Sequence, residues 1–271
     1  MRKIPTFLGV KKVKKKYKKR TDGIGSRQEI INFIKDINAS IVSLSEMNSI
    51  KDIDDRYVGL RHDVDYDLEH AIKLARLEYK NNISATYYLL HSAEYFDIDN
   101  QYFVDQCKIL VDLGHSIGFH NNLLVFYSET KTDIKFYVEK IMNTLKSNSI
   151  DLLSTSSHGD KLCYEKQILN YEIWEEFDDN KYEGLNHNDI QFPKFKLKDF
   201  GFDFEAYFCN FDFYLSDSGG KSIGYDARYR KIMFEKTASE SPDNIGINVL
   251  EKFYNLDKAK LQLLIHPIWW K

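Results

Sequence analysis

The chain has 271 residues, of which 43% are hydrophobic and 29% charged, and this is enough for one domain with a substantial core. Its formal net charge is −3, but residues 1–20 carry ten Lys or Arg and no acid, so the remainder, with 28 basic and 41 acidic residues, has a net charge of −13. An acidic body of this kind excludes duplex nucleic acid as an expected partner.

The N-terminal region is basic. Residues 11–20 (KKVKKKYKKR) could contact an anionic membrane surface peripherally, because each Lys near anionic lipid contributes about 1 kcal/mol; the alternative is a solvated arm. The apolar stretch TFLGV (6–10) is shorter than the ~7 residues that a signal peptide needs, and no run approaches the ~20 apolar residues of a membrane span. We therefore expect a cytoplasmic protein, with its oligomeric state open.

Three cysteines, Cys107, Cys163 and Cys209, are far apart and form no CxxC pair. This spacing argues against a disulfide framework and against a thiolate zinc site. It is typical of reduced thiols in an intracellular protein.

The predicted elements alternate between helices and strands. Ser26 and Glu29 have capping-box spacing ahead of an apolar stripe at helical spacing, which predicts a helix over about 27–45. Residues 57–63 follow as a strand, and Asp67 is the expected N-cap of the next helix. The later elements are a strand at 83–90, a helix at 100–113 ended by Gly114, a strand at 115–120, a helix at 132–147, a strand at 152–155, strands within 200–217, a helix opened by Ser241-Pro242 and continuing to about 254, and a strand at 261–266.

Repeated β-then-α units joined by short polar loops indicate a parallel sheet with crossover helices. No glycine-rich phosphate loop follows the first strand, so the pattern favours an α/β barrel, closed or incomplete, over an open doubly wound sheet. In such barrels functional residues gather at the carboxyl ends of the strands.

Polar residues do fall at these strand ends. Side chains alternate along a strand, so Asp63 and Asp65 should share one face while His62 takes the other. Two carboxylates about 7 Å apart repel each other unless one is protonated or a cation lies beside them. A divalent metal held by one, with the other free as a base, resolves this. The alternative role, a helix N-cap, is preferred for Asp67.

The histidines divide in the same way. His115 and His120 are five residues apart, so they point to opposite faces of their strand and are not expected to bind the same ion. His120 lies nearer the strand end and is the better ligand. His158 and His266 also follow strands, and together these groups at strand ends favour a site over isolated structural histidines.

Three motifs resemble a known family. RHDVD (61–65), GHSIGFHNN (114–122) and LLIHPIWW (263–270), in this order, are similar to the polysaccharide deacetylase superfamily (NodB homology, carbohydrate esterase family 4), and within it to RHDVD-type proteins of bacterial surface-polysaccharide biosynthesis. The resemblance spans about 56–270. It implies a deformed or incomplete (β/α)7 barrel as a single domain at 51–271, preceded at 1–50 by a basic arm and a helix.

The resemblance also implies an activity and a set of roles. The activity is metal-dependent hydrolysis of an acetyl amide or ester on a sugar or polysaccharide precursor. Asp63 is similar to the family's catalytic base, Asp65 to a metal ligand, and His120 to the first histidine of its H(S/T)xxH motif. His266 is similar to the general acid, and Asp217 stands where the family has an aspartate that orients a catalytic partner.

Two departures from the family pattern stand out. Leu124 occupies the position of the second motif histidine, and SSHGD (156–160) stands in place of the arginine-proline motif. His158 could supply the third ligand, because two imidazoles and one carboxylate are a common set for catalytic zinc. The expected site is therefore Asp65, His120 and His158 around a divalent metal, zinc first.

The departures leave an alternative open. A barrel whose catalytic site has decayed would act as a saccharide- or protein-binding module. Residues 160–200, with their acidic and aromatic residues, are either a lid or a surface loop.

Overall fold

The computed structural model describes residues 24–179, 181, 184, 191–218, 223–226 and 249–271. The basic stretch 11–20 and the expected helix start at 241–242 lie outside this part of the chain. The described end of that helix is present, since residues 249–254 are helical.

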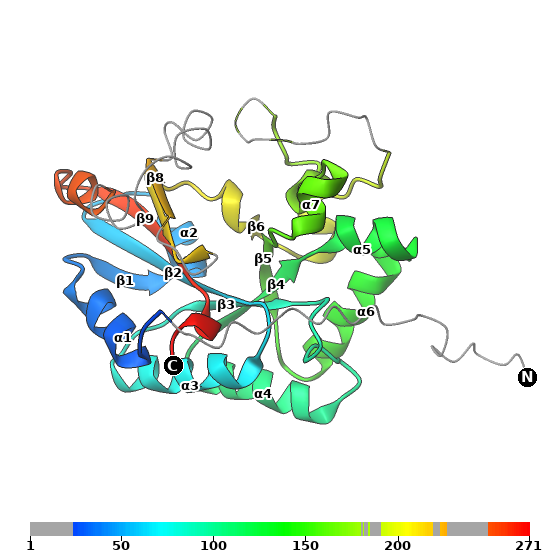
Figure 1. Cartoon of the computed structure of the whole chain (residues 1–271), viewed down its shortest axis with the longest axis horizontal. Coiled ribbons are helices and arrows are strands. Elements are labelled where there is room, and N and C mark those ends of the chain that lie inside the picture. The colour runs from blue at the N-terminus through cyan, green and yellow to red at the C-terminus, as the bar shows by residue number, and fades with distance from the viewer. Residues whose placement is uncertain (1–23, 180, 182–183, 185–190, 219–222, 227–248) are drawn as a thin grey trace, which may run out of the picture.

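One curled sheet forms the centre of the molecule (Figure 1). Its strands run in the order β6-β5-β4-β3-β2-β9-β7-β8, with β1 also paired to β2, and every pairing among them is parallel apart from β7 with β8. Because β6 and β8 are the two edges, the sheet is an open, incomplete (β/α) barrel, as predicted. The strands are β1 (Ser40–Ser43), β2 (Arg56–Val64), β3 (Thr86–Leu90), β4 (Ser116–Asn121), β5 (Leu152–Ser157), β6 (Phe204–Glu205), β7 (Phe213–Ser216), β8 (Ile223–Asp226) and β9 (Ala259–Ile265).

Amphipathic helices cover the outer face of this sheet. Helices α1, α3 and α4 lie along one side (Figure 1), and Leu74, Leu110 and Val138 are among the side chains that the helices bury. The helices are α1 (Arg27–Asp36), α2 (Leu44–Ser49), α3 (Leu68–Lys80), α4 (Gln101–Asp112), α5 (Leu123–Thr130), α6 (Ile134–Ser147) and α7 (Lys161–Lys166), with 3-10 turns η1 (Asn170–Ile173), η2 (Leu197–Phe200), η3 (Ala206–Phe208) and η6 (Pro267–Trp269).

The prediction of a helix over 27–45 is correct at its start and wrong at its end. The capping box of Ser26 and Glu29 starts α1 as predicted, but α1 ends at Asp36, and Ser40–Ser43 then forms β1 beside β2. The β-branched Ile41 and Val42 gain more from pairing with β2 than from continuing a helix. A second capping box, Ser43 with Glu46, then starts α2.

Other local predictions are confirmed. Asp67 caps α3 by accepting from the backbone N–H of Glu69, and Gly114 has the left-handed φ of 81° that ends α4. The aromatic segment 200–217 contains two short strands, β6 and β7. Helix α5 is an element that the periodicity did not predict.

The concave side of the sheet is also filled by side chains. Tyr88 crosses it and bonds Ser154 Oγ through its hydroxyl at 3.0 Å. Gly118 makes room for the Tyr88 ring, because a Cβ there would lie 2.3 Å from Tyr88 Cε1. The concave side of the sheet is therefore packed with side chains at the level of Tyr88 and Gly118.

All three cysteines are buried, and none is in a disulfide with another described residue. Among the described residues, no helix combines the length and the hydrophobicity that a membrane crossing requires.

Candidate metal centre and active site

The carboxyl ends of β2, β4, β5 and β9 meet, and the polar residues that follow them form one cluster. On β2 the predicted alternation is confirmed: Asp63 lies on the concave side with Arg61, whereas His62 points to the helix layer. There the His62 ring bonds Glu78 of α3 at 2.7 Å. His115 also points to this outer layer, where its Nε2 donates to the carbonyl of Ala75.

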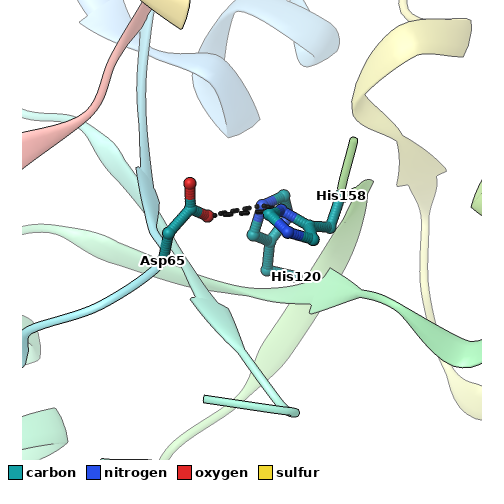
Figure 2. Close-up of side chains that lie close together, drawn as sticks. All are labelled: Asp65, His120 and His158. Carbon is teal, nitrogen blue, oxygen red and sulfur yellow. Dashed lines mark hydrogen bonds and ion pairs between the residues drawn. The ribbon is translucent and has the colours of Figure 1, made fainter. Parts of the chain in front are cut away.

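Asp65, His120 and His158 converge on one point (Figure 2). Their nearest ligand atoms all lie within 4.8 Å of one another. Asp65 Oδ1 is 3.2 Å from His120 Nε2 and 3.4 Å from His158 Nδ1. The structure therefore brings together the three residues that the sequence nominates as ligands.

The chemistry of these donors fits a divalent ion. His120 Nδ1 donates to the carbonyl of Ser156 at 2.7 Å, so its Nε2 faces Asp65 and His158. Asp65 Oδ1 is buried and makes no hydrogen bond of acceptable geometry with any described residue. Two imidazoles with one carboxylate leave open positions on zinc or a similar ion.

The charges within this group support one another. Burial disfavours the carboxylate form of Asp65, but the neighbouring His158 and His120 outweigh it and hold the pKa of Asp65 well below its usual value. Burial likewise opposes a charge on His158, yet Asp65 raises the pKa of His158 above its ordinary value.

Asp63 lies beside the three ligand candidates with one oxygen unused. Its Oδ2 accepts from Arg61 Nη2 at 3.0 Å and is 3.6 Å from His120 Nε2. Its Oδ1 is buried and has no hydrogen-bond partner in the described part of the chain. A fixed carboxylate with one free oxygen can accept a proton from a molecule that enters the site.

Arg61 is a site residue that the sequence reasoning missed. It is fully buried, and besides Asp63 it donates to Gln262 Oε1 at 3.0 Å and to Tyr207 Oη at 3.1 Å. Burial disfavours its charge, but Asp63 outweighs this and holds the pKa of Arg61 above its usual value. The alternation that paired Asp63 with Asp65 also places residue 61 on the same face, so the signal was present.

His266 and Asp217 form a second pair at the edge of this cluster. His266 Nδ1 lies 2.6 Å from Asp217 Oδ1, and His266 Nε2 is 3.8 Å from Asp65 Oδ2. Burial opposes a charge on His266, but Asp217 outweighs it and raises the pKa of His266 to about 9. An imidazolium held in this way can give a proton through Nε2.

Position 124, in helix α5, has a side chain that offers no ligand atom. The Leu124 side chain is buried in the main hydrophobic core, and its backbone N–H donates to Asn170 Oδ1 at 3.0 Å. Asn170 Nδ2 in turn donates to the carbonyl of His158 at 2.8 Å and to Asn122 Oδ1 at 2.9 Å. Asn170, which the sequence reasoning also missed, thus ties the loop after His120 to the loop that carries His158.

Comparison with known proteins gives weak similarity. No family model matches this chain, and no curated protein matches it. Among solved structures, the catalytic domain of a peptidoglycan N-acetylglucosamine deacetylase from Eubacterium rectale is 12% identical over 81% of this chain and 79% of that one, with a TM-score of 0.37. Peptidoglycan deacetylase PdaC from Bacillus subtilis is 12% identical over 85% and 89%, with a TM-score of 0.33.

A third similar structure is BA3943 from Bacillus anthracis, described as a CE4 family pseudoenzyme, which is 13% identical over 78% of this chain with a TM-score of 0.35. This chain spans 54% of the length of that one. The resemblance to the deacetylase superfamily rests on the RHDVD, GHSIGFHNN and LLIHPIWW motifs.

Proposed function

We propose that this protein is a metal-dependent hydrolase that removes an acetyl group from an amide or ester on a sugar or polysaccharide precursor. The observation that carries the proposal is the convergence of Asp65, His120 and His158 beside a second carboxylate, Asp63, that keeps one buried oxygen free. The acetylated sugar as substrate is supported by the RHDVD and IHPIWW motifs.

Asp65, His120 and His158 would hold the ion. A divalent ion held there would polarise the acetyl carbonyl and lower the pKa of water toward ~7. Zinc is the first candidate because its catalytic sites commonly use this donor set. The bond from His120 Nδ1 to Ser156 fixes the ring orientation that presents Nε2.

Asp63 would act as the general base. Arg61 holds Oδ2, so Oδ1 is the oxygen that would accept the proton of the attacking water. The same ion pair keeps the side chain from turning away, and proton transfer depends on such a fixed position.

His266 would act as the general acid. Because Asp217 accepts the Nδ1 proton, Nε2 is the nitrogen that faces Asp65 and would donate to the departing amine or alcohol. The base thus lies in β2 and the acid directly after β9, and these two strands are neighbours in the sheet.

A saccharide-binding barrel without catalysis is the second candidate, and Leu124 favours it because a core side chain there offers no ligand. Metal content separates the two candidates. Cytoplasmic location, peripheral contact of residues 11–20 with an anionic membrane, and the division of the chain at 50/51 are further proposals from the sequence.

The test combines metal content with turnover. The purified protein should bind about one divalent ion per chain, and Asp65→Ala or His120→Ala should lose it. Asp63→Asn should retain the metal but hydrolyse acetylated chito-oligosaccharides or acetylated sugar esters far more slowly, whereas Asp105→Asn, at an exposed position of helix α4, should match the wild type. Full metal content in both ligand variants would overturn the ligand assignment, and undiminished hydrolysis by Asp63→Asn would overturn the base.

A further inference from the structure

The pair formed by His266 and Asp217 has a third member. Asp217 Oδ2 accepts from the indole Nε1 of Trp270 at 2.8 Å, while Oδ1 faces His266 Nδ1 at 2.6 Å. The backbone N–H of His266 also donates to Asp217, at 3.0 Å. Both oxygens of the carboxylate are therefore engaged, and its rotation is fixed from the Trp270 side as well as from the His266 side.

Trp270 is in turn held by the segment that precedes α1. The backbone N–H of Lys271 donates to the carbonyl of Gly25 at 2.9 Å, and that of Ile24 donates to the carbonyl of Trp269 at 2.8 Å. Gly25 packs against the indole: a Cβ at residue 25 would lie 2.8 Å from Trp270 Cζ3, closer than real Cβ contacts. The segment 24–27 therefore seats Trp270 through both its backbone and its ring.

The neighbouring Trp269 provides a contrast. Its Nε1 is buried and has no hydrogen-bond partner among the described residues. Of these two adjacent tryptophans, Trp270 donates its indole N–H to Asp217, whereas Trp269 does not.

We propose that Trp270 is a positioning residue for His266, acting through Asp217, and that Gly25 is required to seat it. A carboxylate fixed by a second donor holds the Nδ1 proton of His266 in one direction, so Nε2 keeps its aim toward the ligand group. The structural part of this inference stands without catalysis, and its kinetic part rests on the proposed function.

The test uses a spectroscopic signal of the bond itself. A short, charge-assisted N–H···O bond gives a far-downfield proton resonance, which can be observed in protein labelled with ¹⁵N-histidine and assigned by its loss in His266→Gln. In Trp270→Phe the indole donor is lost while most of the ring packing stays, and we expect the resonance to move upfield or to disappear through exchange. Trp269→Phe removes an N–H that bonds nothing described and should leave the resonance in place.

Gly25→Ala is the second variant. It tests whether Trp270 positions His266 if circular dichroism shows that Trp270→Phe is unfolded. The added methyl group should displace the indole and change the resonance in the same direction. An unchanged resonance in the folded variants, or an equal loss in Trp269→Phe, would overturn the proposal.

Kinetics separates this inference from the proposed function. If the wild type hydrolyses an acetylated sugar, kcat in Trp270→Phe should fall about tenfold, as the loss of one hydrogen bond to a charged group predicts, with KM and metal content unchanged. If the wild type hydrolyses none, the proposed function fails, and the resonance still decides whether Trp270 positions His266.

Discussion

His120 and His158 face each other across 3.2 Å, from Nε2 to Nδ1, although 38 residues separate them in the chain. Both ring nitrogens also lie within 3.4 Å of one oxygen of Asp65. Three potential ligands gathered at one point, in or just after strand ends and supported by buried hydrogen bonds, are arranged as preformed metal sites are.

His158 should therefore be as necessary for metal binding as His120. We expect His158→Ala to weaken zinc affinity by at least about a hundredfold, since even residues that only support a metal ligand cost up to that factor. Competition titration with a chromogenic chelator measures this, with His70→Ala on α3 as the control. Wild-type affinity in His158→Ala would remove this histidine from the site.

Leu124→His should not improve metal binding, although it restores a histidine at the position of the second motif histidine. The Leu124 side chain lies in the hydrophobic core, so we expect an imidazole there to be buried among apolar side chains and to lower the free energy of unfolding by about 1–3 kcal/mol. Urea denaturation gives this value, and zinc titration should show no gain. Tighter zinc binding in Leu124→His would show that position 124 can reach the ion.

The sequence predicted the candidate site correctly where the alternation of side chains along a single strand, or the position of a residue at a strand end, was sufficient. The alternation along RHDVD placed Asp63 and His62 on opposite faces, and the strand ends brought Asp65, His120 and His158 into one candidate set. Sequence reasoning failed at the end of α1, where the gain of Ile41 and Val42 depends on pairing with residues of β2 that lie 17 positions further along the chain.

Arg61→Lys should separate catalysis from metal binding. A lysine keeps the charge but has no planar fork to reach Asp63, Gln262 and Tyr207 together, so buried acceptors lose their partners. We expect kcat to fall strongly, metal content to stay near one ion per chain, and the free energy of unfolding to fall by about 3 kcal/mol. Hydrolysis assays, metal analysis and urea denaturation report these three quantities; unchanged kcat would show that Asp63 needs no fixed partner.

Asn170→Ala should loosen the loops on both sides of the histidine pair. Asn170 bonds the carbonyl of His158, the side chain of Asn122 and the N–H of Leu124, and the buried groups left unpaired cost about 1–3 kcal/mol each. We expect the free energy of unfolding to fall by at least about 2 kcal/mol, together with weaker zinc binding. Asn32→Ala, at an exposed position of α1, is the control and should stay within about 0.5 kcal/mol of the wild type.

His91 should make the fold sensitive to acid. It is buried between Asn122 N–H and the hydroxyl of Tyr137, and burial lowers its pKa from 6.5 to about 3. Below pH 6.5 His91 becomes protonated in the unfolded chain but stays neutral in the native protein. Its contribution to the free energy of unfolding is therefore fully present above pH 6.5 and is lost as the pH falls toward 3. At pH 5 this amounts to about 2 kcal/mol.

The measurement compares the wild type with His91→Gln by urea denaturation between pH 7 and pH 5. The variant should lose less stability over this interval, because glutamine takes up no proton. Equal losses in both proteins would show that His91 does not carry the effect.

Asn170 and the bond between Asp217 and Trp270 were missed for the same physical reason. Asn170 acts through bonds to three segments that are close only after folding, and nothing in its local pattern distinguishes it from a loop asparagine. Asp217 could be nominated from the resemblance, but its bond to Trp270 depends on the turn η6 and on the contact with Gly25. Tertiary contacts of this kind are invisible to spacing and periodicity.

The central place of β2, between β3 and β9, sets an order for assembly during folding. The three ligand candidates come from the ends of β2, β4 and β5; β3 lies between β2 and β4, and β4 pairs directly with β5, all within residues 56–158. His266 joins this group only when β9 pairs with β2, from which it is separated by about 200 residues of chain, and we expect this long-range contact to form late. We therefore expect a refolding chain to become able to bind metal before it can complete the acid–base pair.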